Sequence, residues 1–201
     1  MKIICIGRNY AEHAKEMNAA VPTEPVFFLK PDTALIKDNQ PFYYPDFSKE
    51  IHHEVELVLK ISKAGKNIEQ EFAHKYYEEI GIGIDFTARD IQAKCKEKGL
   101  PWEKAKAFDG SAPVGSFINK KELPASIGFH LNVNGKTVQK GNTKDLLFSF
   151  DAVVAYVSKF FTLKTGDLIY TGTPEGVGPV AIGDRLEAYL EEQKLLSFEI
   201  R

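Results

Sequence analysis

The chain has 201 residues, of which 43% are hydrophobic and 27% are charged, so it can bury a core without disulfide or metal staples. A net charge of −2 and a pI near 6.2 argue against an electrostatically driven nucleic-acid binder, and no apolar stretch approaches the roughly 18 residues of a membrane span. We therefore expect one domain over residues 1–201, with neither nucleic acid nor membrane as a partner.

The two cysteines indicate a reducing compartment. Cys5 and Cys95 lie far apart and match no zinc spacing or redox motif, so we expect free thiols. The apolar run at residues 3–6 is too short for a signal peptide. The sequence therefore predicts a cytoplasmic protein.

The first elements place a histidine beside a glutamate. Residues 2–7 are typical of a short buried strand, and residues 8–17 of a few helical turns. His13 and Glu16, three positions apart, would share a helix face. A carboxylate next to an imidazole raises its basicity and fixes its orientation, as a general base requires. The alternative is a solvated helix face.

A strand follows at residues 26–29, and prolines make residues 31–47 a loop with short extended pieces. In the next strand, residues 51–61, alternation puts Glu54 and Glu56 on one face. Asp85 ends the apolar run 80–86 and supplies a third carboxylate. Such an oxygen set with open positions suits Mg²⁺ or Mn²⁺, with Ca²⁺ as a further option. The alternative is an edge strand with its acids in water.

The middle of the chain predicts two helices, at residues 68–79 and 88–98. Thr87 would cap the second, which would end at Gly99 and Pro101. A helix N-terminus carries partial positive charge, so a metal-bound acid and an anionic substrate could meet beside Asp85. The alternative is a surface helix with an Arg89–Asp90 pair.

Two further segments could carry chemistry. In residues 103–109, Lys104 and Lys106 would face the same way if the segment is extended. A lysine enclosed in an apolar cleft could bind a carboxylate or stabilise an enolate, although most lysines are solvated. The loop 171–179 combines glycines and threonines that could approach a ligand. It lacks the lysine of a phosphate-binding loop, so nucleotide binding is unsupported, and a plain turn is the alternative.

The second half predicts a substantial β core. Residues 129–140 form a hairpin around Asn134-Gly135, the pair best suited to a type I′ turn. An apolar stripe predicts a core helix from residue 150 to 161, capped by Ser149. A strand at 167–170 and a hairpin at 184–200 follow. Strands outnumber helices without regular alternation, which favours an α+β fold.

Taken in order, these segments resemble the fumarylacetoacetate hydrolase superfamily, in its short acylpyruvase and oxaloacetate-processing branch. The resemblance spans nearly the whole chain, and Gly99-Leu100-Pro101-Trp102 is especially similar to that branch. Its other motifs are Gly7-Arg8-Asn9-Tyr10-x-x-His13-x-x-Glu16, Glu54-x-Glu56, Asp85-x-Thr87-x-Arg89-Asp90-x-Gln92, Lys106, Asn134-Gly135 and Thr171-Gly172-Thr173-Pro174-x-Gly176-Val177-Gly178. One departure is the final turn, where Glu191-Glu192-Gln193-Lys194 replaces a glycine-containing turn.

The resemblance implies a mixed β-sandwich roll, a divalent metal and a homodimer. The matching positions fall into three groups: metal ligands (Glu54, Glu56, Asp85), catalytic residues (His13, Glu16, Lys106) and substrate-binding residues around the pocket (Arg8, Arg89, Gln92, Thr173). In these roles His13 and Glu16 would activate water, and Lys106 would face the substrate.

The activity that we expect is metal-dependent hydrolysis of a C–C bond in small 2-oxo acids of the acylpyruvate type, through a metal-stabilised enolate. The same enolate serves an isomerase, decarboxylase or tautomerase of 2-oxo or 2-hydroxydienoic acids, so those activities are alternatives. A non-catalytic, metal-dependent binding module belongs to a different class and is a third.

Overall fold

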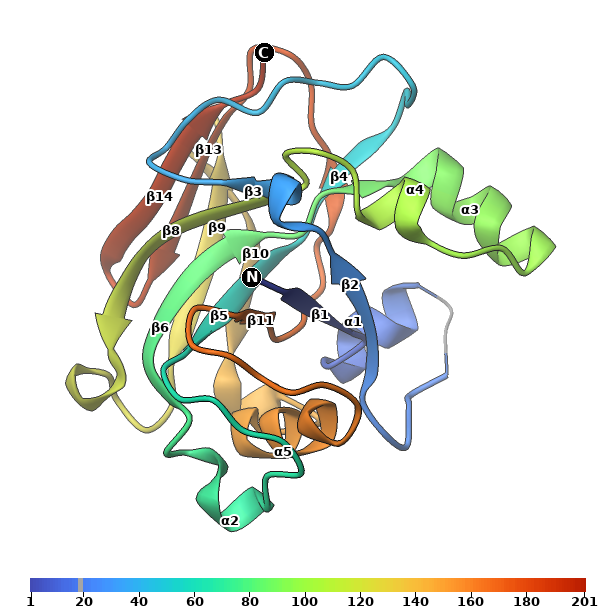
Figure 1. The fold of residues 1–201 in the computed structure, drawn as a ribbon. Coiled ribbons are helices and arrows are strands. Elements are labelled where there is room, and N and C mark those ends of the chain that lie inside the picture. The colour runs from blue at the N-terminus through green and yellow to red at the C-terminus, as the bar shows by residue number, and fades with distance from the viewer. Residues whose placement is uncertain (18–19) are drawn as a thin grey trace.

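The computed structural model describes residues 1–17 and 20–201, which fold into curled sheets flanked by short helices (Figure 1). The largest sheet has seven strands. In spatial order they are β2 (Val26–Lys30), β1 (Ile3–Gly7), β11 (Leu168–Tyr170), β5 (Val55–Ile61), β6 (Tyr77–Ile84), β8 (Ala112–Asn119) and β3 (Leu35–Ile36). The β1–β11 and β3–β8 pairs are parallel and the other neighbours antiparallel, so the sheet is mixed.

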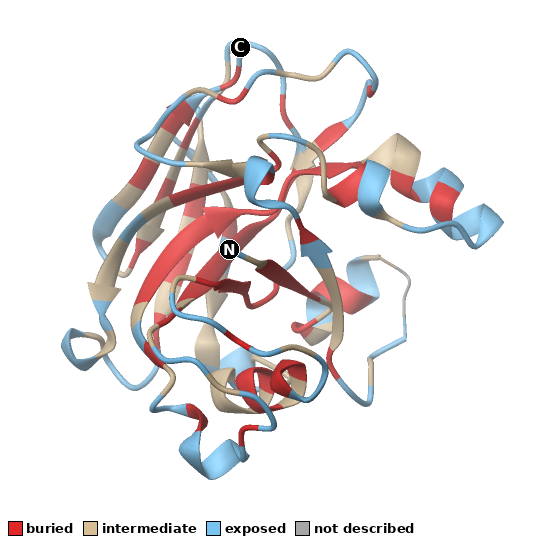
Figure 2. Ribbon diagram, viewed as in Figure 1, coloured by how far each residue is buried: buried red, intermediate tan, exposed pale blue. Residues whose placement is uncertain are grey.

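Two smaller sheets complete the roll. A four-stranded sheet has the order β10 (Lys136–Asn142), β9 (Gly128–Val133), β13 (Arg185–Leu190) and β14 (Gln193–Glu199). A three-stranded sheet has the order β12 (Gly178–Pro179), β4 (Ile51–His53) and β7 (Thr87–Ala88). An apolar core joins the facing strands, and a smaller apolar cluster includes residues of β1, β8 and β11. Figure 2 shows buried residues concentrated along β5 and β6. The α+β class and the sandwich roll are thus confirmed.

The helices lie around the rim of the roll. They are α1 (Ala11–Glu16), α2 (Gln70–Ala73), α3 (Arg89–Lys98), α4 (Glu103–Lys106) and α5 (Phe150–Phe160), with 3-10 turns at Asp32–Ala34, Lys120–Glu122 and Thr143–Asp145. Figure 1 places α3 and α4 together at one side of the sheets and α5 with α2 at another. None of the described helices is long and apolar enough to cross a membrane.

Several local predictions hold. Asn134 and Gly135 have φ of 51° and 77°, as a type I′ turn requires at both central positions. The Ser149 hydroxyl accepts a hydrogen bond from the Ala152 amide and caps α5. The final hairpin also forms without a glycine, because Glu191 takes the left-handed conformation (φ 49°).

Other predictions were wrong. Residues 68–79 hold only the four-residue α2, because the chain then joins the sheet as β6 from Tyr77. Thr87 does not cap α3: its hydroxyl donates to Glu54 Oε1 instead, and the N-cap residue is Ala88. Residues 103–106 are helical, so Lys106 is buried whereas Lys104 is exposed.

Candidate active site

Three buried carboxylates meet where two central strands end. The predicted strand 51–61 is interrupted at Glu54, between β4 and β5, and Glu56 lies within β5 opposite Gly83 of β6. Asp85 follows β6, and its amide donates to the Glu54 carbonyl over 2.8 Å. One oxygen of each carboxylate lies within 4.8 Å of the others. The structure therefore brings together the three acids that the sequence singled out.

Burial and neighbouring charges act differently on these acids. Burial alone would raise the pKa of Glu54, but Lys106 and Arg89 outweigh it and hold that pKa well below its usual value. Burial, reinforced by the Asp85 carboxylate, raises the pKa of Glu56 well above its usual value. The charge on Glu56 is thus poorly compensated by the protein itself.

Two buried lysines border the triad. Lys106 Nζ, on α4, is 2.7 Å from Glu54 Oε2 and 2.9 Å from Asp85 Oδ2. Burial would lower the pKa of Lys106, but Asp85 and Glu54 outweigh that effect and raise it. Lys30 Nζ lies 2.8 Å from Asp85 Oδ1, but the angles are not those of a hydrogen bond, and its protons point to Ser111 and to the Phe86 carbonyl.

The residues fit a divalent cation. Three oxygen donors converge, one of the acids lacks a full countercharge, and Asp85 Oδ1 is a buried oxygen without a hydrogen-bond partner among the described residues. Hard oxygen ligands of this kind are those that Mg²⁺ and Mn²⁺ prefer. An ion there would supply both the missing charge and the missing partner.

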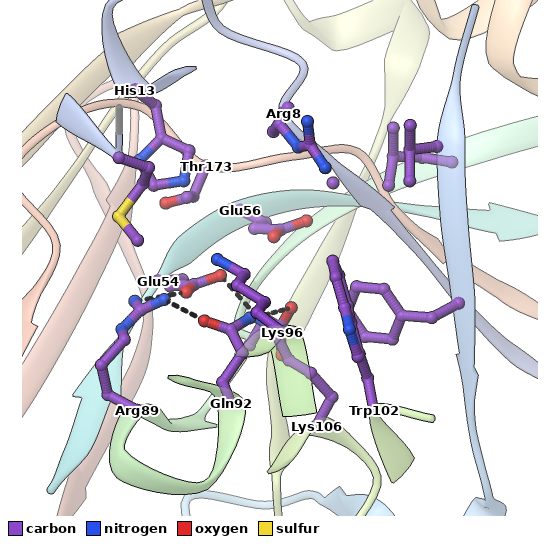
Figure 3. Close-up of a pocket in the computed structure, with 16 residues that line it drawn as sticks. Arg8, His13, Glu54, Glu56, Arg89, Gln92, Lys96, Trp102, Lys106 and Thr173 are labelled. Carbon is purple, nitrogen blue, oxygen red and sulfur yellow. Dashed lines mark hydrogen bonds and ion pairs between the residues drawn. The ribbon is translucent and has the colours of Figure 1, made fainter. Parts of the chain in front are cut away.

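His13 and Glu16 of α1 form the expected pair. His13 Nδ1 lies 3.1 Å from Glu16 Oε2. Because a carboxylate only accepts, Nδ1 carries the proton and Nε2 is left as the basic nitrogen. His13 is buried and lines the same pocket as the triad (Figure 3). The imidazole can therefore exchange a proton with a molecule held there.

The loop after β11 contacts both parts of the site. The Gly172 amide donates to Glu56 Oε2 over 2.7 Å, and the Gly176 amide donates to Glu16 Oε1 over 3.0 Å. Between them Thr173 lines the pocket. Asn9, fully buried, holds the start of this loop through a 2.8 Å bond to the Thr171 carbonyl.

Cations line much of the pocket wall. Arg89 Nη2 lies 2.7 Å from Glu54 Oε1, and Arg89 Nη1 donates to the Gln92 side chain over 2.8 Å. Arg8 and Lys96 also face the pocket (Figure 3), and within the described ranges neither has a carboxylate partner. Partial burial, with the nearby Arg89, Arg8 and Lys106 charges, lowers the pKa of Lys96.

All ten residues singled out from the sequence line this one pocket except Glu16, which acts on it through His13. The sequence did not predict that Lys96 and Trp102 line the pocket or that Lys30 lies beside Asp85. It also did not predict the buried Gln139, which is hydrogen-bonded to Thr173. A lysine closing the apolar strand 26–30 was the one available signal for Lys30. Nothing local marks Gln139, because its partners lie 34 and 86 residues away.

The curled sheets, the buried carboxylate triad that suits a divalent cation and the histidine–glutamate pair together indicate an α+β enzyme of the metal-dependent class. The family described as Fumarylacetoacetate (FAA) hydrolase C-terminal matches residues 2–201, and the chain belongs to this family. It is 43% identical to the mitochondrial oxaloacetate tautomerase FAHD1 of Mus musculus, over 99% of this chain and 91% of that protein. It is 45% identical to the oxaloacetate tautomerase YcgM of Escherichia coli K12, over 96% and 90%.

A solved structure of similar sequence has the same fold. The crystal structure of fumarylpyruvate hydrolase from Pseudomonas aeruginosa, in complex with Mn²⁺ and pyruvate, superposes with a TM-score of 0.94 at 38% identity. The match covers 100% of this chain and 89% of that one. The family thus includes enzymes named for two different reactions of small 2-oxo acids.

Proposed function

We propose that the protein is a Mg²⁺- or Mn²⁺-dependent tautomerase that interconverts the keto and enol forms of a small 2-oxo dicarboxylate such as oxaloacetate. This places one of the sequence-based alternatives ahead of C–C hydrolysis. Support comes from the two tautomerases, which match over nine-tenths of their length, and from the charge of the pocket.

The excess of positive charge carries the proposal. Four cationic side chains line a pocket that holds three carboxylates, and a divalent ion would increase the excess. Arg89 and Lys106 are paired with Glu54, which leaves Arg8 and Lys96 for a ligand. A substrate with two carboxylates supplies the matching charge, one group near the ion and one toward Arg8 and Lys96.

The side chains can perform the proton transfer. His13 Nε2 would take the proton from carbon 3, and the electrons of that C–H bond would form the C2=C3 double bond. The 2-oxo oxygen would then carry the negative charge and finally gain a proton. Lys106, kept charged by its two acid partners, would stabilise that oxygen. A divalent ion held by Glu54, Glu56 and Asp85 would supply Lewis-acid stabilisation of the same charge.

Hydrolysis of an acylpyruvate is the second candidate, and the orientation of the His13–Glu16 pair is equally compatible with it. A base with a free Nε2 can deprotonate water as well as carbon, and Lys106 would stabilise the pyruvate enolate that leaves. The fumarylpyruvate hydrolase with its bound pyruvate supports this candidate. The two reactions differ in what the pocket does with the end of the substrate that lies away from the 2-oxo acid group.

An assay panel separates the candidates. The metal-freed protein is given Mg²⁺ or Mn²⁺, and enol-to-keto conversion of oxaloacetate is compared with cleavage of acetylpyruvate and isomerisation of a hydroxylated dienoic diacid. We expect oxaloacetate conversion well above the rate with metal ion alone, abolished by chelator and restored by metal. Cleavage of acetylpyruvate without faster oxaloacetate conversion would establish the hydrolase instead. Binding of Mn²⁺ and pyruvate without any turnover would indicate a binding module.

The same proposal includes a single catalytic domain over residues 1–201 that works as a cytoplasmic homodimer. The chain length supports the single domain, the two free thiols support a reducing compartment, and the family resemblance supports the homodimer. Light scattering of the purified protein should give twice the 22.5 kDa mass of one chain.

A further inference from the structure

We infer that Gln139 is a positioning residue that fixes the direction of the Thr173 hydroxyl, so that its proton is offered to the ligand in the pocket. Gln139 does not line the pocket, and its strand, β10 of the β9–β10 hairpin, carries none of the three acids. The inference rests on the proposed function only in taking Thr173 as a ligand contact.

The orientation of the Gln139 amide is determined by its partners. Its Oε1 accepts from the Val55 amide over 3.0 Å and lies 2.9 Å from His53 Nδ1. Its Nε2 donates to Thr173 Oγ1 over 2.9 Å and to the Pro174 carbonyl over 3.0 Å. A backbone amide only donates and a carbonyl only accepts, so the reverse orientation would leave both unsatisfied.

This orientation decides what Thr173 can do. Because Nε2 donates, Thr173 Oγ1 accepts, and its own proton remains available. Thr173 is buried, and among residues 1–17 and 20–201 that proton has no acceptor. A buried hydroxyl proton without a protein partner, on a side chain that lines a pocket, is directed at whatever fills the pocket.

A β-bulge brings Gln139 to this position. Thr137 pairs with Asn132 and Gln139 with Leu131, so Val138 is an extra residue on β10. In a regular ladder of the same sequence, Val138 would pair with Leu131 and Gln139 with His130, so Gln139 would point to the opposite side of the sheet. The bulge is therefore what turns Gln139 into the core.

The same bulge supports the rest of the loop. A Cβ on Gly176 would lie 2.4 Å from the Val138 carbonyl oxygen, and Gly176 has a φ of +92°. The loop thus packs directly on the bulge at a position that suits only glycine. On the other side, Gln139 holds the residues before and after Glu54, in the break between β4 and β5.

The test uses Gln139→Glu, which keeps an acceptor for Val55 and His53 but replaces the donor with an oxygen. In mildly alkaline buffer the introduced carboxylate accepts the Thr173 proton and withdraws it from the pocket. We expect pyruvate to bind the Mn²⁺-loaded protein about tenfold more weakly by calorimetry, the effect of one hydrogen bond to a charged group. Gln40→Glu makes the same change at an exposed position and should leave binding unchanged.

Two comparisons separate positioning from a structural or purely electrostatic role. Gln139→Met loses all four hydrogen bonds but leaves the hydroxyl free to rotate, so it should lower the melting temperature more than Gln139→Glu and weaken pyruvate binding less. In a Thr173→Val background, Gln139→Glu should weaken binding no further.

Binding losses that follow the melting temperatures, or an undiminished effect of Gln139→Glu in the Thr173→Val background, would overturn the inference. So would a Thr173→Val protein that binds pyruvate normally. These readouts need no turnover, so failure of oxaloacetate conversion in the unsubstituted protein would contradict the proposed reaction alone.

Discussion

The two halves of the site are built differently. The acid triad and Lys106 are buried. Glu54 and Asp85 flank central strands, Glu56 lies within β5 and Lys106 ends α4. Ion pairs join Lys106 to two of the acids, and the Gly172 amide donates to the third. The His13–Glu16 pair belongs to a helix of six residues, and the Glu16 side chain is 32% exposed. One half is part of the core of the roll, whereas the other lies on its rim.

The difference indicates that the buried half binds the cation and that the half on the rim transfers protons. Long-range contacts hold the carboxylates of the triad close together despite their mutual repulsion, which favours binding of a cation. The His13–Glu16 pair is instead held within one short helix and by the Gly176 amide, and it forms no ion pair with the triad or Lys106 among the described residues. We therefore expect substitutions in the buried half to change metal binding or charge stabilisation, and substitutions on the rim to change proton transfer alone.

The largest effect should follow Glu56→Gln. The amide keeps an acceptor for the Gly172 proton but removes the one carboxylate that the protein leaves poorly compensated. Mn²⁺ should no longer raise the melting temperature, and metal-dependent turnover should disappear. Glu78→Gln, on the exposed part of β6, is the control and should retain both. Wild-type Mn²⁺ affinity in the Glu56→Gln protein would show that this carboxylate is no ligand.

Lys106→Ala tests the buried half in a second way. Removing the cation that neutralises developing oxygen charge should lower kcat by about 10² to 10³, the usual loss of one such donor. Mn²⁺ binding should persist, because the three carboxylates remain. Lys104→Ala changes an exposed lysine of the same helix and should have no effect. Unchanged turnover in Lys106→Ala would exclude a role for Lys106 in charge stabilisation.

Glu16→Gln tests the rim. The amide can no longer stabilise a charged imidazole, so we expect kcat to fall about tenfold to a hundredfold, part of what general acid–base catalysis supplies. Affinity for Mn²⁺ and pyruvate should not change. Glu12→Gln, exposed on the same helix, is the matched control. If Glu16→Gln instead weakens Mn²⁺ binding, the two halves are not separate.

The same contrast explains what the sequence could predict. Local signals sufficed for α3, α5 and the Asn134-Gly135 hairpin, because each depends on neighbours within a few residues. Alternation and motif order brought the three acids and the His13–Glu16 pair together. The helix over 68–79 failed because pairing of β6 with β5 and β8 outweighs local preference. Gln139 had no local signal and Lys30 had only its place at the end of an apolar strand, because their roles come from partners that the tertiary fold supplies.

The smallest effect should come from Lys96, at the edge between the two halves. Its ammonium faces the pocket without an acid partner among the described residues but is partly solvated, so its attraction for a substrate carboxylate is screened. Lys96→Gln should raise KM for oxaloacetate about threefold to tenfold, because it removes a partly solvated ion pair with the substrate carboxylate. The kcat should stay nearly unchanged. Pyruvate, which lacks the second carboxylate, should bind as before, and Lys94→Gln on the same helix should change neither value. Equal weakening for oxaloacetate and pyruvate would place Lys96 near the shared 2-oxo acid end, and the excess of positive charge would then no longer argue for a dicarboxylate.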